Sequence, residues 1–521
     1  MKKTLYIPGA YNTVTERETN YIPVRYILAI ALAILETAAV IAVVMLLSYY
    51  VPYFYLAMWA TEIGCVIHII ACDEQPDYKI PWLLLVLIVP VAGLMLYFLF
   101  GSRKLQRKYI RRLNAMRQQT YRSDTSQLLQ KLKNQAPLAA SQATMLTKIA
   151  DSNLFTNTKT EYFAQGEEMH PCLLTDLWKA EHFIFMEYFI VEEGKFWNSI
   201  LEVLKERAAA GVEVRIIYDD IGCMMTLPGD YDKQLKRSGI DAVPFSRLKG
   251  NADSEFNNRS HRKITVIDGK VGYTGGINLA DEYINEVEKF GHWKDTGLRL
   301  EGEAVRELTK LFLIDYGINV RKLPPPKHNY FPEYSAEGSG MLVPFGDGPV
   351  PIYDQQVGKS VIENMLNHAV KSFYAMSPYL IIDDTICQSV ESAARRGVTV
   401  RLILPGIPDK WLVKELACSF YERLIKAGVE IYEYTPGFVH AKVYMADGEI
   451  AMVGTINLDH RSLVHNFENG VWMYQCDCLE AIKTDFSSII TKCVRIDENK
   501  TRWPLYRRVI RSTVKVFAPL M

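Results

Sequence analysis

The stretch His261–Asn278, HRKITVIDGKVGYTGGIN, is matched far downstream by His440–Asn457, HAKVYMADGEIAMVGTIN. Both read His-x-Lys-x-x-x-x-Asp, and both continue to a glycine and then to Ile-Asn-Leu at the same offsets. A pattern of this length does not arise twice in one chain by chance, so the two stretches mark an internal duplication. The duplicated residues are His261, Lys263, Asp268 and Asn278 in the first motif, and His440, Lys442, Asp447 and Asn457 in the second.

Each motif predicts a strand, a tight turn and a returning strand. The residues after the lysines, I-T-V-I and V-Y-M-A, are apolar or β-branched and favour buried strands. Alternate side chains of a strand share one face, so the histidine and lysine of each motif point the same way. The Asp-Gly pair that follows is typical of a two-residue hairpin turn. The asparagine then returns on the neighbouring strand, within reach of the same pocket.

Two such units facing each other would surround one phosphate with two imidazoles, two ammonium groups and two amides. One imidazole could attack phosphorus while the other protonates the leaving oxygen. The lysines would hold the non-bridging oxygens and stabilise the charge that develops in the transition state. This arrangement needs no metal ion, and we expect no cofactor.

Residues outside the signature are expected to support this chemistry. An imidazole needs a carboxylate that fixes its tautomer, and the candidates are Asp295 after the first motif and Glu468 after the second. Either could instead be a surface carboxylate. Asp268 and Asp447 are expected to brace the turns and the interface between the halves rather than to touch substrate. Arg461 has no counterpart in the first half, and its type suits a headgroup contact or a structural ion pair equally well.

Strand-like and helix-like segments recur in the same order around both motifs. FIFMEYFIV (183–191), a helix and VEVRIIYDDIG in the first half correspond to FYAMSPYLII, a helix and VTVRLILPG in the second. Strand–helix–strand units predict an α/β fold with a parallel or mixed sheet in each half, the two halves sharing one active site. The first half carries an additional polar stretch at 246–259, which predicts a loop at the mouth of the site.

Three apolar runs precede the two halves. Tyr26–Tyr50 and Ile80–Phe100 are each long enough to cross a bilayer as a transmembrane helix. Val51–Ala71 contains Pro52, Glu62 and His68, so it is either a third span or an interfacial or re-entrant segment. The stretch 102–122 carries eight Lys and Arg residues and no acid. Together with the apolar runs, it predicts a multi-pass membrane protein whose catalytic part lies on the cytoplasmic side, and it also suits contact with anionic headgroups.

These features divide the chain into six segments. They are a membrane domain at 1–101 with runs at about 26–50, 51–71 and 80–100, a basic juxtamembrane linker at 102–139, a first half at 140–320, a linker at 321–348, a second half at 349–498 and a basic amphipathic tail at 499–521. If helical, the tail places Arg507, Arg508, Arg511 and Lys515 on one side. It would then lie on an anionic membrane or dock against the domain.

The overall charge disfavours nucleic acid as a partner. The chain has 59 Lys and Arg residues against 59 Asp and Glu residues, a balance that does not suit a non-specific nucleic-acid binder. Its nine cysteines are scattered and predict no disulfide framework, which fits a reducing compartment.

The duplicated His-Lys-Asp motif resembles the signature of the phospholipase D superfamily, in which two α/β halves meet at one active site and the intermediate is a phosphohistidine. Within that superfamily, YTGGINLADEYI, WKDTGLRLEG and GTINLDHRS resemble bacterial cardiolipin synthases. The resemblance implies a transferase that makes cardiolipin and glycerol from two phosphatidylglycerols, with anionic membrane lipids as partners. We assign His261 as the nucleophile and His440 as the acid and base, although the near-symmetric halves allow the reverse.

Other functions would use the same residues. A hydrolytic phospholipase D, or a transferase using another alcohol, differs only in water exclusion and in the acceptor pocket. A membrane-anchored nuclease is disfavoured by the neutral charge and by the lack of an aromatic–basic pattern. A non-catalytic membrane scaffold is disfavoured because both motifs are intact. The sequence leaves the oligomeric state open.

Overall fold

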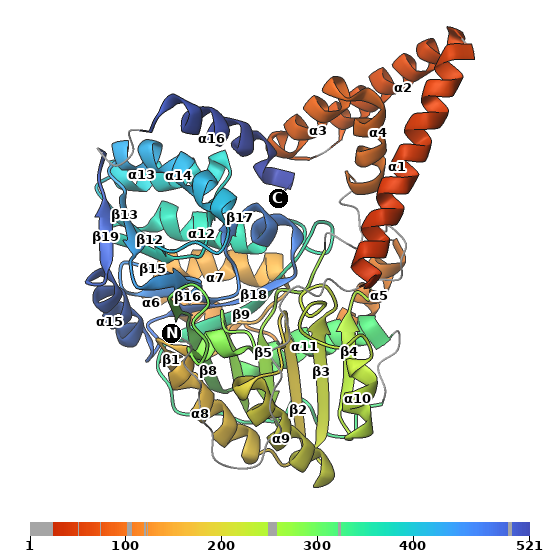
Figure 1. Ribbon diagram of the computed structural model, residues 1–521. Helices are drawn as coiled ribbons and strands as arrows, with labels where there is room; N and C mark the ends of the chain where they lie inside the picture. The colour runs from red at the N-terminus through yellow and green to blue at the C-terminus, as the bar shows by residue number, and fades with distance from the viewer. Residues whose placement is uncertain are drawn as a thin grey trace, which may run out of the picture. The chain divides into compact units, whose positions relative to one another are not determined.

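The computed structural model describes residues 24–50, 52–72, 74–101, 107–118, 121, 123–247, 258–320, 325–498 and 503–520. The chain splits into two units, Met1–Pro52 and Tyr53–Met521. The described part of the first unit is helix α1 (Val24–Tyr50) and Pro52, the first residue of the next helix. The second unit contains both motif-bearing halves (Figure 1). Most of the polar stretch predicted to form a loop at the site lies outside the described residues.

Three helices open the second unit. They are α2 (Pro52–Ala71), α3 (Pro76–Ile88) and α4 (Pro90–Phe100). Side chains between them, Trp82 and Val86 among them, form a small apolar cluster of their own. In the part of the chain that the structure describes, we find no helix that has both the length and the apolar composition needed to cross a membrane.

The prediction of a single helix over Ile80–Phe100 is wrong, because the helix is interrupted at Val89. Proline has no N–H to donate and disfavours a helical conformation in the residue before it. Pro90 follows Val89, whose φ of −129° and ψ of 73° lie outside the helical region. The run therefore forms α3 and α4, whereas Val51–Ala71 forms the single helix α2.

The first half is built on a seven-stranded mixed sheet. In spatial order its strands are β1 (Thr158–Phe163), β8 (Gly297–Gly302), β6 (Val271–Gly275), β5 (Ile264–Ile267), β2 (Phe183–Tyr188), β3 (Glu213–Asp219) and β4 (Asp241–Phe245). The neighbours β2, β3 and β4 run parallel and are linked by α9 (Lys195–Ala209) and α10 (Tyr231–Arg237). The other neighbours pair antiparallel.

The second half repeats this topology with one added edge strand. In spatial order its strands are β9 (Met341–Asp347), β18 (Glu468–Tyr474), β16 (Ile450–Gly454), β15 (Val443–Ala446), β10 (Ser372–Met376), β12 (Thr399–Pro405), β13 (Glu430–Tyr434) and β19 (Cys493–Ile496). Helices α13 (Asp384–Arg395) and α14 (Trp411–Lys426) link its parallel strands β10, β12 and β13. The repeat confirms the predicted duplication and the mixed sheet in each half.

One apolar core runs through both halves. Helix α11 (Val305–Val320) packs on strands of the first sheet and also contacts β9 of the second. Helices α12 (Val357–His368) and α7 (Pro137–Ala150) pack together against the second sheet. The cluster includes Phe185 and Val343, one from each half. Since β9 falls inside 321–348, that segment is partly a strand and not only a connection.

The described chain contains further short elements. They include α5 (Arg107–Gln118), α6 (Ser126–Gln135), α8 (Gly166–Trp178), α15 (Leu479–Ile490), α16 (Leu505–Phe517), the 3-10 turns η2 (Asp281–Ile284) and η5 (Ala518–Leu520), the π-helical turn η3 (Arg461–His465), and strands β7 (His292–Lys294), β11 (Leu380–Ile381), β14 (Gly437–Val439) and β17 (Leu458–Asp459).

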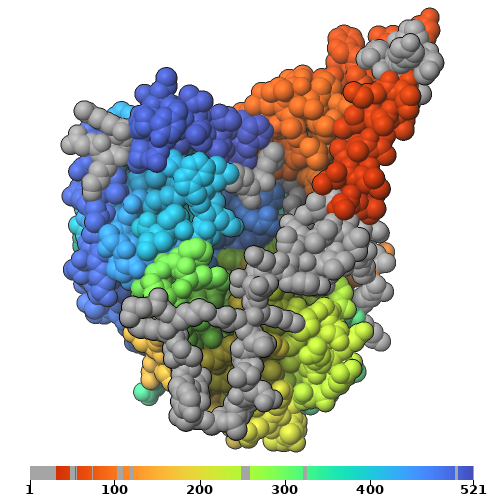
Figure 2. All heavy atoms as spheres, in the orientation of Figure 1, coloured from red at the N-terminus to blue at the C-terminus, as the bar shows by residue number. Residues whose placement is uncertain are grey.

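The C-terminal helix α16 docks on α14, at the surface of the second half (Figure 2). The buried Arg511 donates to Glu415 at 2.7 Å, and the Lys515 ammonium lies 4.5 Å from the centre of the Phe420 ring. The predicted basic side is therefore divided, because Arg511 points inward while Arg508 is exposed. The outward face exposes the apolar side chains of Leu505, Tyr506 and Val509.

Candidate active site

Backbone pairing ties the second motif to the first half. Strand β14, which ends one residue before His440, pairs in parallel with β7 of the first half. Where this pairing ends, the His440 N–H donates to the Lys294 carbonyl at 2.7 Å. The next residue of the first half is Asp295, and its Oδ2 lies 2.6 Å from Nδ1 of His440. The second motif's histidine is thus held by a carboxylate of the first half.

The first motif is tied to the second half in the same way. Ser260 forms a parallel bridge to Phe467, and the His261 N–H donates to the Phe467 carbonyl at 2.8 Å. The next residue, Glu468, places Oε2 at 2.9 Å from Nδ1 of His261. The structure therefore brings Asp295 and Glu468 to the histidines, in a crossed arrangement. Each carboxylate follows one motif along the chain and holds the histidine of the other.

The two lysines complete a buried group of four side chains. Lys263 Nζ donates to the His261 carbonyl at 2.7 Å, and Lys442 Nζ donates to the His440 carbonyl. Lys442 Nζ also lies 2.8 Å from His440 Nδ1, so that this nitrogen has Asp295 on one side and an ammonium on the other. All four motif side chains are buried. Removal from water strengthens their interaction with a phosphate.

Aromatic rings line both histidines. The Phe189 ring meets His261 edge to face at 5.3 Å between centres. Tyr283 and Trp293 lie 5.3 Å and 5.5 Å from His440, also measured between ring centres. These rings orient the imidazoles and exclude water from them. They were not predicted, because Tyr283 and Trp293 act at the second motif although they belong to the first half.

The two motif asparagines have different surroundings. Asn278 accepts from the Ile190 N–H at 3.1 Å and donates to the Tyr283 hydroxyl at 2.7 Å, so it fixes the wall of the site. Asn457 is buried, and within the described residues its Oδ1 has no hydrogen-bond partner. Of the two, Asn457 is therefore the one with an acceptor left for substrate.

Asp268 and Asp447 lie at the ends of β5 and β15 that point away from the histidines. Each carboxylate accepts three backbone N–H groups of its own half, from residues 181–183 and from residues 370–372, at 2.6–2.9 Å. Each aspartate and the glycine after it have φ between 53° and 72°, as a type I′ turn requires. Both aspartates thus brace a turn, but the expected bracing between the halves is wrong.

The His261 pair contains a buried carboxylate that is well supplied with hydrogen-bond donors. Beside the imidazole, Glu468 accepts from the hydroxyls of Thr455 and Ser462 and from the Asn466 amide. Burial alone would raise the pKa of Glu468, but His261, Lys263 and these donors leave the pKa lowered, so the carboxylate is ionised. Burial, reinforced by Lys263, lowers the pKa of His261 to about 4. At neutral pH this imidazole is uncharged and its Nε2 carries a free electron pair.

The His440 pair is built differently. Gly276 stands where the second motif has Thr455, and a Cβ there would lie 2.0 Å from Asp295 Oδ1. Asp295 therefore has no hydroxyl donor at this position and accepts from the Thr296 N–H. Burial raises the pKa of Asp295 to about 7 and lowers the pKa of His440. Asp295 and His440 together can therefore hold a proton near neutral pH.

The lysines make the site sensitive to alkaline pH. Burial lowers the pKa of Lys263 to about 7 and that of Lys442 to about 8, and the cationic forms that bind phosphate predominate only below these values. We expect kcat/KM to fall as the pH rises through 7 to 8, and to fall on the acid side near pH 4, where His261 gains a proton. Initial rates from about pH 4 to pH 9, at constant ionic strength, test this. A profile that stays flat to pH 9 would contradict it.

Gly276→Ala should damage the His440 pair without unfolding the protein. The new methyl group would push the Asp295 carboxylate away from Nδ1, and a displacement of about 1 Å costs roughly a hundredfold in rate. Gly64→Ala is the matched control, because a Cβ there has no neighbour within 4 Å. Initial rate and thermal midpoint are measured for both variants. Wild-type activity in Gly276→Ala would show that the position of Asp295 does not matter.

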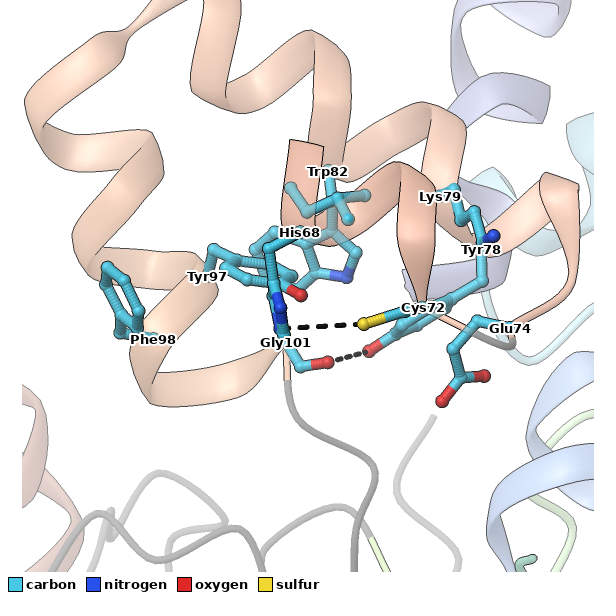
Figure 3. Close-up of a pocket in the computed structure, with 10 residues that line it drawn as sticks. His68, Cys72, Glu74, Tyr78, Lys79, Trp82, Tyr97, Phe98 and Gly101 are labelled. Carbon is cyan, nitrogen blue, oxygen red and sulfur yellow. Dashed lines mark hydrogen bonds between the residues drawn. The ribbon is translucent and has the colours of Figure 1, made fainter. Parts of the chain in front are cut away.

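A separate cavity of about 170 Å³ lies among α2, α3 and α4 (Figure 3). His68 Nε2 lies 3.5 Å from Cys72 Sγ, and the Tyr78 hydroxyl donates to the Gly101 carbonyl at 3.3 Å. These polar groups are thus engaged within the cavity wall. No motif residue lines this cavity, so it is not the candidate active site.

In comparison with known proteins, one family model matches both halves of the chain. A family model described as "Cardiolipin synthase, PLD-like domain" matches residues 173–311 and 362–490. A second model, "Phospholipase_D-nuclease N-terminal", matches residues 63–102. The chain is 33% identical to a cardiolipin synthase of Geobacillus thermodenitrificans over 89% of this chain and 94% of that protein. It is 40% identical to an uncharacterized protein of Streptococcus mutans, over 88% of this chain and all of that one.

A solved structure supports the fold. The phosphatidylserine synthase of Haemophilus influenzae matches with a TM-score of 0.53 at 16% sequence identity, over 70% of this chain and 93% of that chain. At this identity the likeness concerns the fold alone. The two-half architecture is therefore shared with a solved protein.

Proposed function

The chain belongs to the family of phospholipase D-like cardiolipin synthases, and we propose that it joins two phosphatidylglycerols into cardiolipin and glycerol. The observation that carries this proposal is the buried group of two histidines and two lysines, each histidine held by a carboxylate of the opposite half. Such a site supplies a nucleophile, a proton donor and two cations for one phosphodiester. The names of the relatives supply the substrate class.

The Glu468–His261 pair and the Asp295–His440 pair favour different roles for the two histidines. His261 is the nucleophile, because its neutral imidazole is oriented by an ionised Glu468. Its Nε2 attacks phosphorus, and the bond from phosphorus to the glycerol oxygen breaks. His440 gives the leaving oxygen its proton, since the Asp295–His440 pair can hold one near neutral pH. The products of this step are glycerol and a phosphatidyl-histidine.

The second step reverses the proton transfer. His440 takes the proton from a glycerol hydroxyl of the second phosphatidylglycerol, and that oxygen attacks phosphorus. The phosphorus–nitrogen bond breaks and returns the electron pair to His261. Lys263 and Lys442 hold the non-bridging oxygens in both steps. One phosphodiester is lost and one is formed, so the exchange needs no external energy source.

We also propose that the protein is a multi-pass membrane protein whose catalytic halves face the cytoplasm. The apolar runs over 26–50 and 51–71 and the match of residues 63–102 to the N-terminal family model support membrane attachment. The eight basic residues of 102–122 support the cytoplasmic side. Anionic lipids are then both the surrounding surface and the substrate.

A lipid assay tests the proposed reaction. The full-length protein in detergent is incubated with phosphatidylglycerol and a chelator, and the lipids and free glycerol are quantified. We expect cardiolipin and glycerol in equal amounts. Phosphatidic acid with glycerol and no cardiolipin would identify a hydrolase. Cleavage of a nucleic-acid phosphodiester with no lipid turnover would reject the lipid assignment.

A further inference from the structure

Arg461 carries a cationic side chain to which the described residues offer no hydrogen-bond or ion-pair partner. It opens the π-helical turn η3, directly after β17, and its side chain is partly buried. Within the described chain its guanidinium forms no hydrogen bond and no ion pair, and Arg461 is not among the residues with further contacts. The alternative of a structural ion pair, left open by the sequence, therefore finds no support.

The position of Arg461 is fixed beside the active site. The next residue, Ser462, donates its N–H to Asp459 and its hydroxyl to Glu468, both at 2.7 Å. Glu468 in turn holds His261. Arg461 is thus one residue away from the hydrogen-bond network of the nucleophile.

Charges of both halves act on this guanidinium. Besides Asp459 and Glu468 of the second half, they include Asp219 and Arg259 of the first. Arg461 therefore lies where the halves meet, which is also where the two motifs meet. Burial lowers its pKa, because these charges do not replace the water it has lost.

Other buried cations around the motifs already have anionic partners. Arg259 pairs with Asp219 at 3.0 Å, Arg262 with Asp315 at 2.6 Å, and Lys294 with Asp485 at 2.8 Å. Unlike these three, the Arg461 guanidinium donates to no other residue in the part of the chain that the structure describes. A partly buried cation that lacks a partner is costly, and a bound anion would offset that cost.

The proposed reaction requires such an anion beside the reacting phosphorus. The acceptor phosphatidylglycerol brings a second phosphate, which in the product is separated from the first by one glycerol bridge. Lys263 and Lys442 face the phosphorus that is transferred. A guanidinium suits the second phosphate, because its planar donors bind two phosphate oxygens at once.

We propose that Arg461 binds the phosphate of the acceptor phosphatidylglycerol and so selects an anionic phospholipid over water or a neutral alcohol. This inference rests on the proposed function and names a specificity-determining residue for it. Arg461 does not take part in the formation of the phosphatidyl-histidine. Its removal should therefore change what accepts the phosphatidyl group and not how fast the group is loaded.

Competition between two acceptors tests this directly. Wild type, Arg461→Gln and Arg461→Lys are incubated with phosphatidylglycerol and butanol, and the ratio of cardiolipin to phosphatidylbutanol is measured. Both products come from the same intermediate, so loading and folding effects cancel in the ratio. Loss of a charged hydrogen bond predicts a fall of about tenfold to a hundredfold in Arg461→Gln, and a smaller fall in Arg461→Lys.

The outcomes separate this inference from the reaction itself. Arg395→Gln, which removes an exposed arginine from the same half, should leave the ratio at the wild-type value. An unchanged ratio in Arg461→Gln would overturn the inference, and so would an equal fall of both products. If the wild type forms phosphatidylbutanol but no cardiolipin, the proposed function itself fails.

Discussion

His440→Asn is expected to stop turnover of phosphatidylglycerol. With a donor whose leaving group needs no proton, the same variant should still load a phosphatidyl group onto His261. Losing the proton donor should lower the steady-state rate by about a thousandfold or more. A phosphatidyl-nitrophenol donor bypasses this defect in the first step, because nitrophenolate leaves without a proton. Rapid mixing should then show a burst of one nitrophenolate per enzyme, followed by a stall. Intact-protein mass should rise by one phosphatidyl group.

His261→Asn is the matched variant and should show no burst. It loses the nucleophile, so no phosphorus–nitrogen bond forms whatever the leaving group. Both variants keep a similar volume and a polar atom in the buried site, and thermal midpoints establish that both are folded. A burst in His261→Asn and none in His440→Asn would reverse the two roles. A burst in neither variant would argue against a covalent intermediate.

The local geometry of both motifs could be predicted from the sequence because it depends on near neighbours. Strand alternation predicts that His261 and Lys263 share a face, and the Asp-Gly pairs predict the turns that follow. The structure contains these turns, with Asp268 and Gly269 at φ of 53° and 66°. Repetition of the same segments in the same order also predicted two similar halves, which the two sheets confirm.

The crossing of the carboxylates could not be predicted, because it depends on contacts between the halves. Counting along the chain assigns Asp295 to the first motif. The pairing of β7 with β14 instead brings it to His440. The network around Glu468 was missed for a related reason, although a signal was present. Ser462 and Asn466 are polar residues within the buried stretch just before the strand that begins at Glu468.

The helical break in the N-terminal region shows a different limit of prediction from sequence. Hydropathy over Ile80–Phe100 averages across the whole run and does not register a single proline. Pro90 removes one N–H and changes the backbone of Val89, which is enough to divide the run into two helices. A long apolar run therefore does not by itself predict one continuous helix when it contains a proline.

Glu468→Gln and Asp295→Asn are expected to damage different steps, and this difference tests the crossed arrangement. Glutamine cannot accept from the His261 Nδ1–H and the surrounding hydroxyls in the same way, so the nucleophile loses its tautomer and orientation. A comparable change in a serine protease costs about 10⁴ in rate, and we expect roughly 10³ to 10⁴ here. The nitrophenolate burst should be slowed by this factor in Glu468→Gln.

Asp295→Asn should spare that burst, because nitrophenolate needs no proton from His440. With phosphatidylglycerol as donor, the same variant should be severely slowed, by about a hundredfold or more, since glycerol cannot leave unprotonated. Adding Asp295→Asn to His440→Asn should then cost little more, because the two residues act as one unit. If each motif were served instead by the carboxylate that follows it in sequence, Asp295→Asn would remove the burst and Glu468→Gln would leave it. The burst therefore reports which half holds the nucleophile.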